Sequence, residues 1–274
     1  MANQERRAAE PYRFMMIGAH PDDMELRCGG LALRLRQKGH HVMFLSMTDG
    51  GAGHHRMTRE DLVRRRSEEA QAAARTLDIA YRIMPVADGR LEPSLDARDM
   101  LIREIRQYAP HVIMTHRIVD YHPDHRACGQ LVMDCAYMVN VPLYCPAVPC
   151  PPQPPVFLSV WDRFSRRDPF SPDVVVPIDD LVERKIDAAL CHVSQFYEWL
   201  PHVEGWKDVG EAPSFAEKTA LLRAQLRSRF SAEARLYPEK MPAGCRYAET
   251  FEWNEYGAAL TGELRRAMTE IPGE

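Results

Sequence analysis

Compact apolar runs alternate with amphipathic stretches along the first half of the chain. The apolar runs cover residues 12–19, 41–48, 81–86 and 111–116, and they are typical of strands that are buried on both faces. The amphipathic stretches predict helices over residues 25–38, 58–77, 94–108 and 125–139. This alternation predicts an α/β fold, a Rossmann-like three-layer sandwich with a mostly parallel sheet.

The second half of the chain begins with a proline-rich segment. Residues 141–155 contain seven prolines, too many for a helix or a central strand, and we expect a stiff surface loop that either borders a site or merely crosses the surface. The later elements predicted are strands over 156–162, 173–179 and 247–253 and helices over 180–199 and 214–230. We therefore expect one domain over residues 1–274 with a C-terminal elaboration, preceded by a flexible tail over 1–11.

The composition argues against a nucleic-acid-binding protein, a membrane protein and a disulfide-rich protein. The 274 residues include 35 basic and 39 acidic side chains, a net charge of −4, which gives no basic footprint for nucleic acid. No apolar stretch approaches the roughly 18–20 residues of a membrane span, and the N-terminus lacks the apolar core of a signal peptide, so the expected compartment is the cytoplasm. The seven cysteines contain no C-x-x-C pair, which favours reduced thiols over a disulfide framework or a cysteine zinc site.

Two clusters of polar residues follow predicted strands. The first is A-H-P-D-D over 19–23, after the first strand, and the second is H-P-D-H over 122–125, after the fourth. In a doubly wound sheet these strand ends meet at the switch point where ligands bind. A dinucleotide site would need G-x-G-x-x-G, and two carboxylates would repel a pyrophosphate, so a nucleotide-dependent oxidoreductase is disfavoured and a divalent cation is favoured.

Histidine nitrogens and carboxylate oxygens suit Zn²⁺, although another divalent first-row ion would also fit. We predict that His20, Asp23 and His125 are the metal ligands and leave one position open. Asp22 is then the predicted general base for an activated water, and His122, if protonated, the group that stabilises a tetrahedral oxyanion. Asp124 is predicted to orient or charge His122.

The two motifs together resemble the PIG-L/LmbE-like family of zinc-dependent N-acetylglucosaminyl deacetylases. The first motif continues into Glu25 and the pair Gly29–Gly30, and the second is Tyr121-His122-Pro123-Asp124-His125-Arg126. Further short matches are Arg66-x-x-Glu69, Asp88-Gly89-Arg90-Leu91, His192-x-Ser194-Gln195 and Ala248-Glu249-x-Phe251. The resemblance implies the same metal ligands, base and electrophile, and hydrolysis of an N-acyl group on an amino sugar. One departure is Gly51, where the family commonly has glutamate.

Three further side chains are candidate substrate contacts. Arg66 would hold a sugar hydroxyl or phosphate, or else form a surface ion pair on its helix. His116, at the end of the fourth strand, and His192 would reach the pocket, or else be structural histidines. Glu25 is expected to favour the dipole of the helix it begins.

The expected partner is a small amino-sugar conjugate. Two alternatives stay open: the same metal hydrolase acting on a non-sugar acyl amide, and a non-catalytic carbohydrate-binding protein. The proline-rich segment could also face another subunit, so a homo-oligomer is open as well.

Overall fold

The computed structural model describes residues 10–166 and 168–271, and its centre is a seven-stranded sheet in the order β3-β2-β1-β4-β5-β7-β6. The strands are β1 (Arg13–Gly18), β2 (His41–Thr48), β3 (Ala80–Val86), β4 (Val112–Thr115), β5 (Val156–Val160), β6 (Val174–Pro177) and β7 (Ala248–Asn254). Strands β1 to β5 pair in parallel, and β7 pairs antiparallel to both β5 and β6. The predicted α/β fold with a mostly parallel sheet is confirmed.

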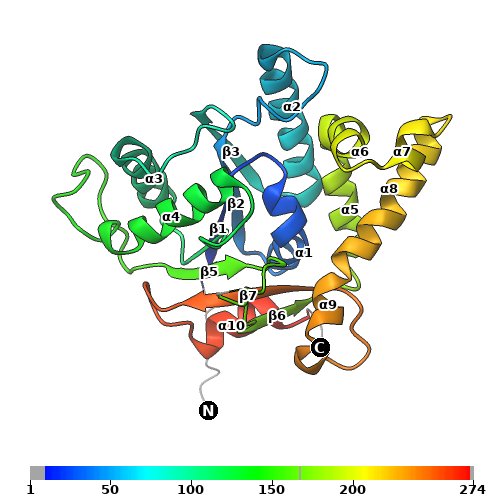
Figure 1. Ribbon diagram of the computed structural model, residues 1–274. Helices are drawn as coiled ribbons and strands as arrows, with labels where there is room; N and C mark the ends of the chain where they lie inside the picture. Colours follow the sequence, from blue (N-terminus) through cyan, green and yellow to red (C-terminus); the bar gives the residue numbers. More distant parts are fainter. Residues whose placement is uncertain (1–9, 167, 272–274) are drawn as a thin grey trace.

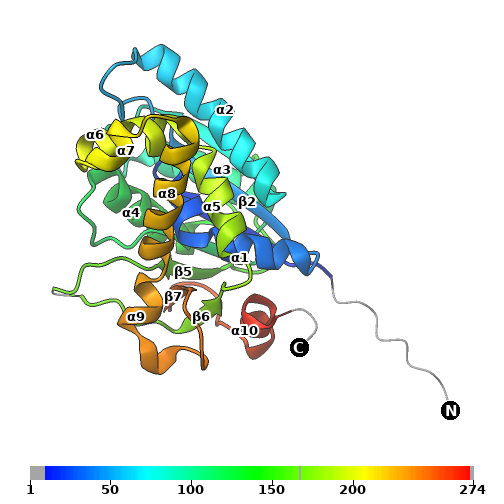
Figure 2. The ribbon, with the colours of Figure 1, turned by 90° about the vertical axis from the view of Figure 1, so that its right-hand side faces the viewer.

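Helices cover both faces of this sheet (Figure 1). They are α1 (Asp23–Gln37), α2 (Arg59–Leu77), α3 (Leu95–Tyr108), α4 (Pro123–Met138), α5 (Val182–Leu190), α6 (Leu200–Val203), α7 (Lys207–Glu211), α8 (Phe215–Phe230), α9 (Ala232–Leu236) and α10 (Gly262–Thr269). A π-helix (Ser194–Trp199) links α5 to α6, and a 3₁₀ turn (Pro238–Lys240) follows α9. Helices α5 to α8 gather beside α1 and α2 on one side of the molecule (Figure 2).

Strand β1 shows why the sheet needs two covering layers. Its side chains alternate between the faces: Phe14 and Met16 pack in one apolar cluster with α1, whereas Met15 and Ile17 pack in another with α3 and α4. All four are fully buried. The continuous apolar run that predicted this strand is thus the signature of a strand covered on both sides.

The predicted bounds of two helices agree with the structure to within a residue because capping residues fix them. The hydroxyls of Thr58 and Ser94 accept the N–H groups of Asp61 and Ala97 at the starts of α2 and α3, each at 3.3 Å. Asp78 ends α2 in the left-handed conformation.

The proline-rich segment 141–155 contains neither helix nor strand, as predicted. The buried guanidinium of Arg106 on α3 holds its start by donating to several main-chain oxygens. These acceptors include the carbonyls of Val141, Tyr144 and Val148, at 2.6–2.9 Å. The segment is thereby tied to α3, and it contributes no side chain to the cavity described below.

The C-terminal third differs most from the predictions. The single helix predicted over 180–199 is wrong: α5 ends at Leu190, and the chain continues as a π-helix from Ser194. Helices α6, α7, α9 and α10 were not predicted; they have four, five, five and eight residues, too few for a clear periodicity. The single domain over 1–274 stays a prediction, and most of the predicted tail over 1–11 lies outside the described residues. Among the described helices, none is long and apolar enough to cross a bilayer.

Candidate active site

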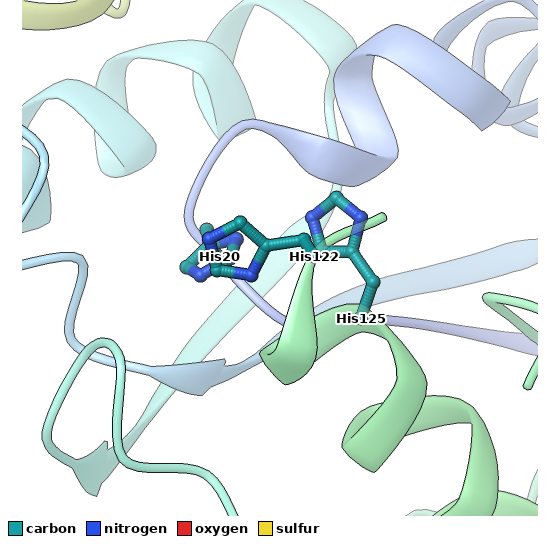
Figure 3. Close-up of side chains that lie close together, drawn as sticks. All are labelled: His20, His122 and His125. Atoms are coloured by element: carbon teal, nitrogen blue, oxygen red, sulfur yellow. The ribbon is translucent and has the colours of Figure 1, made fainter. Parts of the chain in front are cut away.

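The two polar motifs meet where the order of the sheet reverses. Strands β1 and β4 are parallel neighbours, and the chain leaves them toward opposite faces, into α1 and α4. The ring of His20, after β1, therefore lies 4.6 Å from that of His122 and 5.2 Å from that of His125, after β4, measured between centroids. Figure 3 shows these three imidazoles close together. The structure brings the two motifs into one site, as their positions predicted.

Asp23 lies at the centre of this site. Its Oδ1 is 3.3 Å from Nε2 of His125, and its Oδ2 is 3.5 Å from Nδ1 of His20. The same Oδ2 accepts the main-chain N–H of His20 at 2.7 Å. Burial favours the neutral acid, but the charges of His125 and His116 hold the pKa of Asp23 well below its ordinary value. Asp23 is therefore an anion between two imidazoles.

The other nitrogen of His20 faces two more carboxylates. Its Nε2 is 3.3 Å from Oδ2 of Asp124 and 3.2 Å from Oδ1 of Asp88. Burial opposes the positive ring, yet these contacts and Asp23 raise the pKa of His20 well above its ordinary value. Asp124 also accepts the N–H groups of Gly89 and Leu91, at 2.7 and 3.3 Å. The carboxylate of Asp124 thus contacts His20 rather than His122, and toward His122 it acts through its negative charge, which opposes the lowering of the pKa of that ring.

His125 repeats this arrangement. While Nε2 faces Asp23, Nδ1 is 3.2 Å from Oδ1 of Asp120. Burial acts to lower the pKa of His125, but the two carboxylates outweigh it and raise this pKa to about 9. Asp120 was missed from the sequence, and Asp88 was quoted there only as part of a short family match, without a role at the site. Both follow a strand end, which is the signal that could have found them.

Asp22, next to Asp23 in the chain, has an unusual backbone conformation. Its φ is 150°, in the region that L-residues rarely adopt. It holds the N-cap position of α1, but its side chain makes no capping hydrogen bond. Instead, its Oδ1 lies 3.0 Å from Nη2 of Arg66. Burial raises the pKa of Asp22, and the negative charge of Asp23 adds to this, against the effect of Arg66.

Arg66 is almost fully buried, at 2% exposure, so its predicted surface pairing is wrong. Besides Asp22 it contacts the carbonyl oxygens of Pro21 and Gly50. It therefore joins the loop after β1 to the loop after β2 and fixes the carboxylate of Asp22 at the wall of the site.

His122 is the N-cap of α4, and its Nδ1 accepts the N–H of Asp124 at 3.2 Å. A neutral imidazole that accepts at Nδ1 carries its proton on Nε2. Burial, followed by the charges of His20 and His125, lowers the pKa of His122. The neutral ring is favoured, and it keeps one N–H donor.

The structure places His116 and His192 behind the site. Nε2 of His116 accepts the N–H of Ala19 at 3.3 Å and lies 3.1 Å from Oδ2 of Asp23. Its ring stacks on His125 at 4.2 Å. Burial, followed by the charge of His125, lowers the pKa of His116 to about 4. Neither histidine lies on the cavity wall, so a direct substrate contact has no support for either.

His192 forms a fully buried pair with Glu25, at 2.8 Å between Nε2 and Oε1. Glu25 does stand in the first turn of α1, as predicted, but its side chain is used in this pair. Burial acts to lower the pKa of His192, but the negative charge of Glu25 and its hydrogen bond outweigh this, and the pKa is raised. Of the motif that contains His192, Gln195 on the π-helix reaches the cavity, and its amide donates to the carbonyl of Gly53 at 3.1 Å.

A cavity of about 340 Å³ opens over these groups. Its wall contains the predicted His20, Asp22, Asp23, Arg66, His122 and His125. The cavity also contains residues that were not predicted as site residues. Tyr121 and Gln195 belong to motifs quoted from the sequence, whereas no local pattern marks the others, most of which come from α1 and the C-terminal helices: Leu26, Arg27, Trp199, Leu200, Glu204 and Arg229.

The departure at Gly51 has a local explanation. A Cβ atom there would lie 2.5 Å from Nη1 of Arg59 and 2.6 Å from a methyl group of Val63. Arg59 forms an ion pair with Asp49 in this space. A larger side chain at position 51 would require this pair to move.

The sequence model described as PIG-L, GlcNAc-PI de-N-acetylase, matches residues 15–136 of the chain. The resemblance to the PIG-L family is confirmed. The matched region runs from β1 to α4 and contains both motifs of the site.

Known proteins extend the likeness. The chain is 27% identical over 213 residues to a diacetylchitobiose deacetylase of Thermococcus kodakarensis, covering 70% of this chain and 74% of that protein. The crystal structure of N,N'-diacetylchitobiose deacetylase from Pyrococcus horikoshii superimposes with a TM-score of 0.72 at 24% identity, covering 90% of this chain and 85% of that one. At these identities the superposition establishes the fold.

The same fold also carries another reaction. The 4-carboxy-2-hydroxymuconate hydratase GalB of Pseudomonas putida superimposes with a TM-score of 0.68 at 18% identity, covering 91% of this chain and 98% of that one. Fold alone therefore does not select deacetylation, and the residues of the site have to carry the functional argument.

Proposed function

We propose that the protein is a metal-dependent hydrolase that removes an N-acyl group, most simply acetyl, from an amino sugar or its conjugate. One observation carries the proposal: His20 and His125 each turn one nitrogen to Asp23 and the other to a further carboxylate. Metal-binding histidines in proteins have this arrangement, since the outer carboxylate fixes the ring and strengthens the inner nitrogen as a ligand.

The residues present fit a divalent ion. Two nitrogens and one carboxylate are the donors found in catalytic zinc sites with an open position. Donor atoms of Asp23, His116 and His125 lie within 4.8 Å of one another, as do those of His20, His122 and His125. His20, Asp23 and His125 would hold the ion, with Zn²⁺ as our assignment. The ion would supply Lewis acidity, which activates water and polarises an acyl oxygen at neutral pH.

Asp22 and His122 have the remaining roles. The carboxylate of Asp22 stands on the cavity wall beside Asp23 and would accept the proton of the attacking water. The raised pKa of Asp22 suits a group that must take up a proton and give it back. Nε2–H of His122 would donate a hydrogen bond to the oxygen that becomes negative in the tetrahedral intermediate. As the C–N bond breaks, Asp22 would pass the proton it took from water to the departing amine nitrogen.

Two observations support an amino sugar as substrate. The relative from Thermococcus kodakarensis is a diacetylchitobiose deacetylase, and the family matched over residues 15–136 is described by a GlcNAc-PI de-N-acetylase. The cavity also presents Tyr121 and Trp199, whose rings offer apolar faces beside polar groups.

The test is primary-amine release from the zinc-loaded chain. The panel contains the methyl glycoside of N-acetylglucosamine, N,N'-diacetylchitobiose and N-acetylphenylalanine, and His125→Ala is the matched control. We expect amine release from the sugars, and none from the control. Release only from N-acetylphenylalanine would favour the non-sugar alternative. Absence of release from the whole panel would contradict a deacetylase, and addition of water to 4-carboxy-2-hydroxymuconate would favour the hydratase chemistry of GalB.

A further inference from the structure

Two arginines on the cavity wall have no role in the chemistry described above. Arg27 lies one helical turn after Asp23 on α1, so both side chains project from the same face of the helix into the cavity. Arg229 reaches the same cavity from the last turn of α8. Residues 202 positions apart thus place two guanidinium groups on one cavity wall.

Neither guanidinium has an anionic partner in the part of the chain that the structure describes. No carboxylate of residues 10–166 and 168–271 lies within ion-pair distance of Arg27 or Arg229. The third arginine of the cavity, Arg66, is paired with Asp22. On α8 itself, Arg227 binds Glu183 at 2.6 Å. Of the three arginines on the cavity wall, Arg27 and Arg229 are thus the two without a carboxylate partner among the described residues.

Arg27 is held in place by an aromatic ring. The carbon of its guanidinium lies 5.3 Å from the centroid of Trp161, a residue that is 9% exposed and follows β5. A cation stacked in this way keeps its N–H donors directed outward at little entropic cost. Arg27 is thus half-buried and preorganised.

Most carboxylates of the cavity wall contact other residues than Arg27 and Arg229. Asp23 and Asp88 contact histidines, and Asp22 contacts Arg66. Glu204 also lines the cavity, on the side of Arg229. One carboxylate balances at most one of the two guanidinium groups, so at least one of them is left to meet an anionic group of the substrate.

We propose that Arg27 and Arg229 form a subsite for an oxyanion, a carboxylate or a phosphate, that the substrate carries outside its N-acyl group. Guanidinium forks match both anions in geometry and charge. This inference rests on the proposed deacetylase function and adds to it that the favoured substrate is an acidic conjugate.

The test compares kcat/KM between a neutral derivative of N-acetylglucosamine and derivatives that carry an anion. They are the methyl glycoside of N-acetylglucosamine, its carboxymethyl glycoside, and N-acetylglucosamine 1-phosphate and 6-phosphate. We expect zinc-loaded protein to favour at least one anionic member over the methyl glycoside by about tenfold or more, the effect of one charge-assisted contact pair. Preference for the carboxylate or for a phosphate distinguishes the two anions and, for phosphate, its position.

Variants then assign the preference to the two arginines. The double variant Arg27→Ala with Arg229→Ala should bring the ratio of anionic to neutral kcat/KM close to one. Arg27→Lys with Arg229→Lys should keep part of it, which guards against a mere folding defect. Arg227→Ala, on the same helix but outside the cavity, should leave the ratio at the wild-type value.

Two results would overturn this inference alone: equal kcat/KM for neutral and anionic substrates in the wild type, or a ratio that the double alanine variant does not change. In both cases the methyl glycoside still reports deacetylation. Absence of amine release from every member at stoichiometric zinc would instead overturn the proposed function, and this inference with it.

Discussion

Two clusters of buried charge attach helix α1 to the rest of the molecule, and they differ in one respect. The open cluster, His20, Asp22, Asp23, His122 and His125, lies at the N-terminal end of α1 and borders the cavity. The closed cluster, Lys185, Glu233 and Glu249, lies along the middle of α1 and does not border it.

In the closed cluster the carboxylates meet donors at short distances. Glu249 lies 2.7 Å from Nζ of Lys185 and accepts the N–H groups of Gly30 and Leu31 at 2.8 and 2.7 Å. Glu233 accepts the N–H and hydroxyl of Thr250 at 2.6 and 2.7 Å. The side chain of Glu249 thus fixes the position of α1 over β7.

In the open cluster, groups of the same kind lie close together: two aspartates are neighbours, and the centroids of three imidazole rings lie within 5.2 Å of one another. Asp22 and Asp23 are adjacent, and the strained backbone of Asp22 is held by neighbouring structure. Such a set of groups costs stability, and in the proposed function an ion and a substrate would enter it from the cavity. The comparison teaches that exposure to a cavity, rather than burial or charge, separates the functional cluster from the structural one.

The largest effect is expected from Asp22→Asn in the open cluster. Loss of a general base should lower kcat by about 10³-fold, while Asn keeps the acceptor for Arg66 and the metal ligands are intact. Amine-release kinetics, metal content and thermal unfolding measure the three consequences. Equal loss of metal in this variant and in His125→Ala would contradict the separation of base from ligand.

Glu249→Ala tests the closed cluster. It leaves Lys185 buried without its partner and should lower the free energy of unfolding by about 3–5 kcal/mol. Denaturant unfolding measures this loss, with Glu255→Ala, exposed and just beyond β7, as the control. A stable Glu249→Ala protein that has lost zinc-dependent activity would mean that the two clusters are not separate in function.

These two clusters also show what the sequence could and could not predict. The motifs that contain His20, Asp23, His122 and His125 could be found because each comes after an apolar strand, the first directly after β1 and the second at the start of α4, which follows β4. The order of the strands then brings the two motifs together. Glu249 lies 219 residues from Gly30, its partner on α1, and nothing local indicates that pairing. Of the two alternatives left open for His192, the structure agrees with the structural histidine, and its partner Glu25, 167 residues away, could not be identified from the sequence.

The glycine pair of the first motif is explained by the same packing. A Cβ on Gly30 would lie 2.5 Å from Ile178, so the close approach of the chain to α1 requires glycine. The proline content of 141–155 predicted a loop, but the contacts of Arg106 that place it away from the cavity could not be predicted.

The variant Glu233→Gln tests whether the stability of the closed cluster depends on pH. Burial, with the charge of Glu249, raises the pKa of Glu233 to about 7, against the effects of Lys185 and Thr250. A carboxyl whose folded pKa is raised contributes stability below its unfolded pKa, and this contribution is lost as pH rises through the folded pKa.

Wild-type stability should therefore fall relative to Glu233→Gln between about pH 4.5 and pH 7, by on the order of 3 kcal/mol. Urea unfolding of both proteins across this range measures the difference. If the difference in unfolding free energy between the two proteins did not change from pH 4.5 to pH 7, the raised pKa of Glu233 would be contradicted.

The smallest effect is expected from Asp120→Asn, behind His125. Loss of the outer carboxylate of a ligating histidine weakens metal binding by about 10–100-fold. Competition with a chelator measures the affinity, and Asp134→Asn, farther along α4, is the control. Unchanged affinity would show that the outer carboxylates do not tune this site.

The central claim is that the open cluster acts through one bound ion. The most direct measurement strips the chain of metal, adds Zn²⁺ in steps, and follows bound zinc and amine release from the methyl glycoside of N-acetylglucosamine together. The account predicts that activity rises with bound zinc and levels off near one ion per chain. Full activity in the stripped chain, or one bound ion without any amine release, would contradict it.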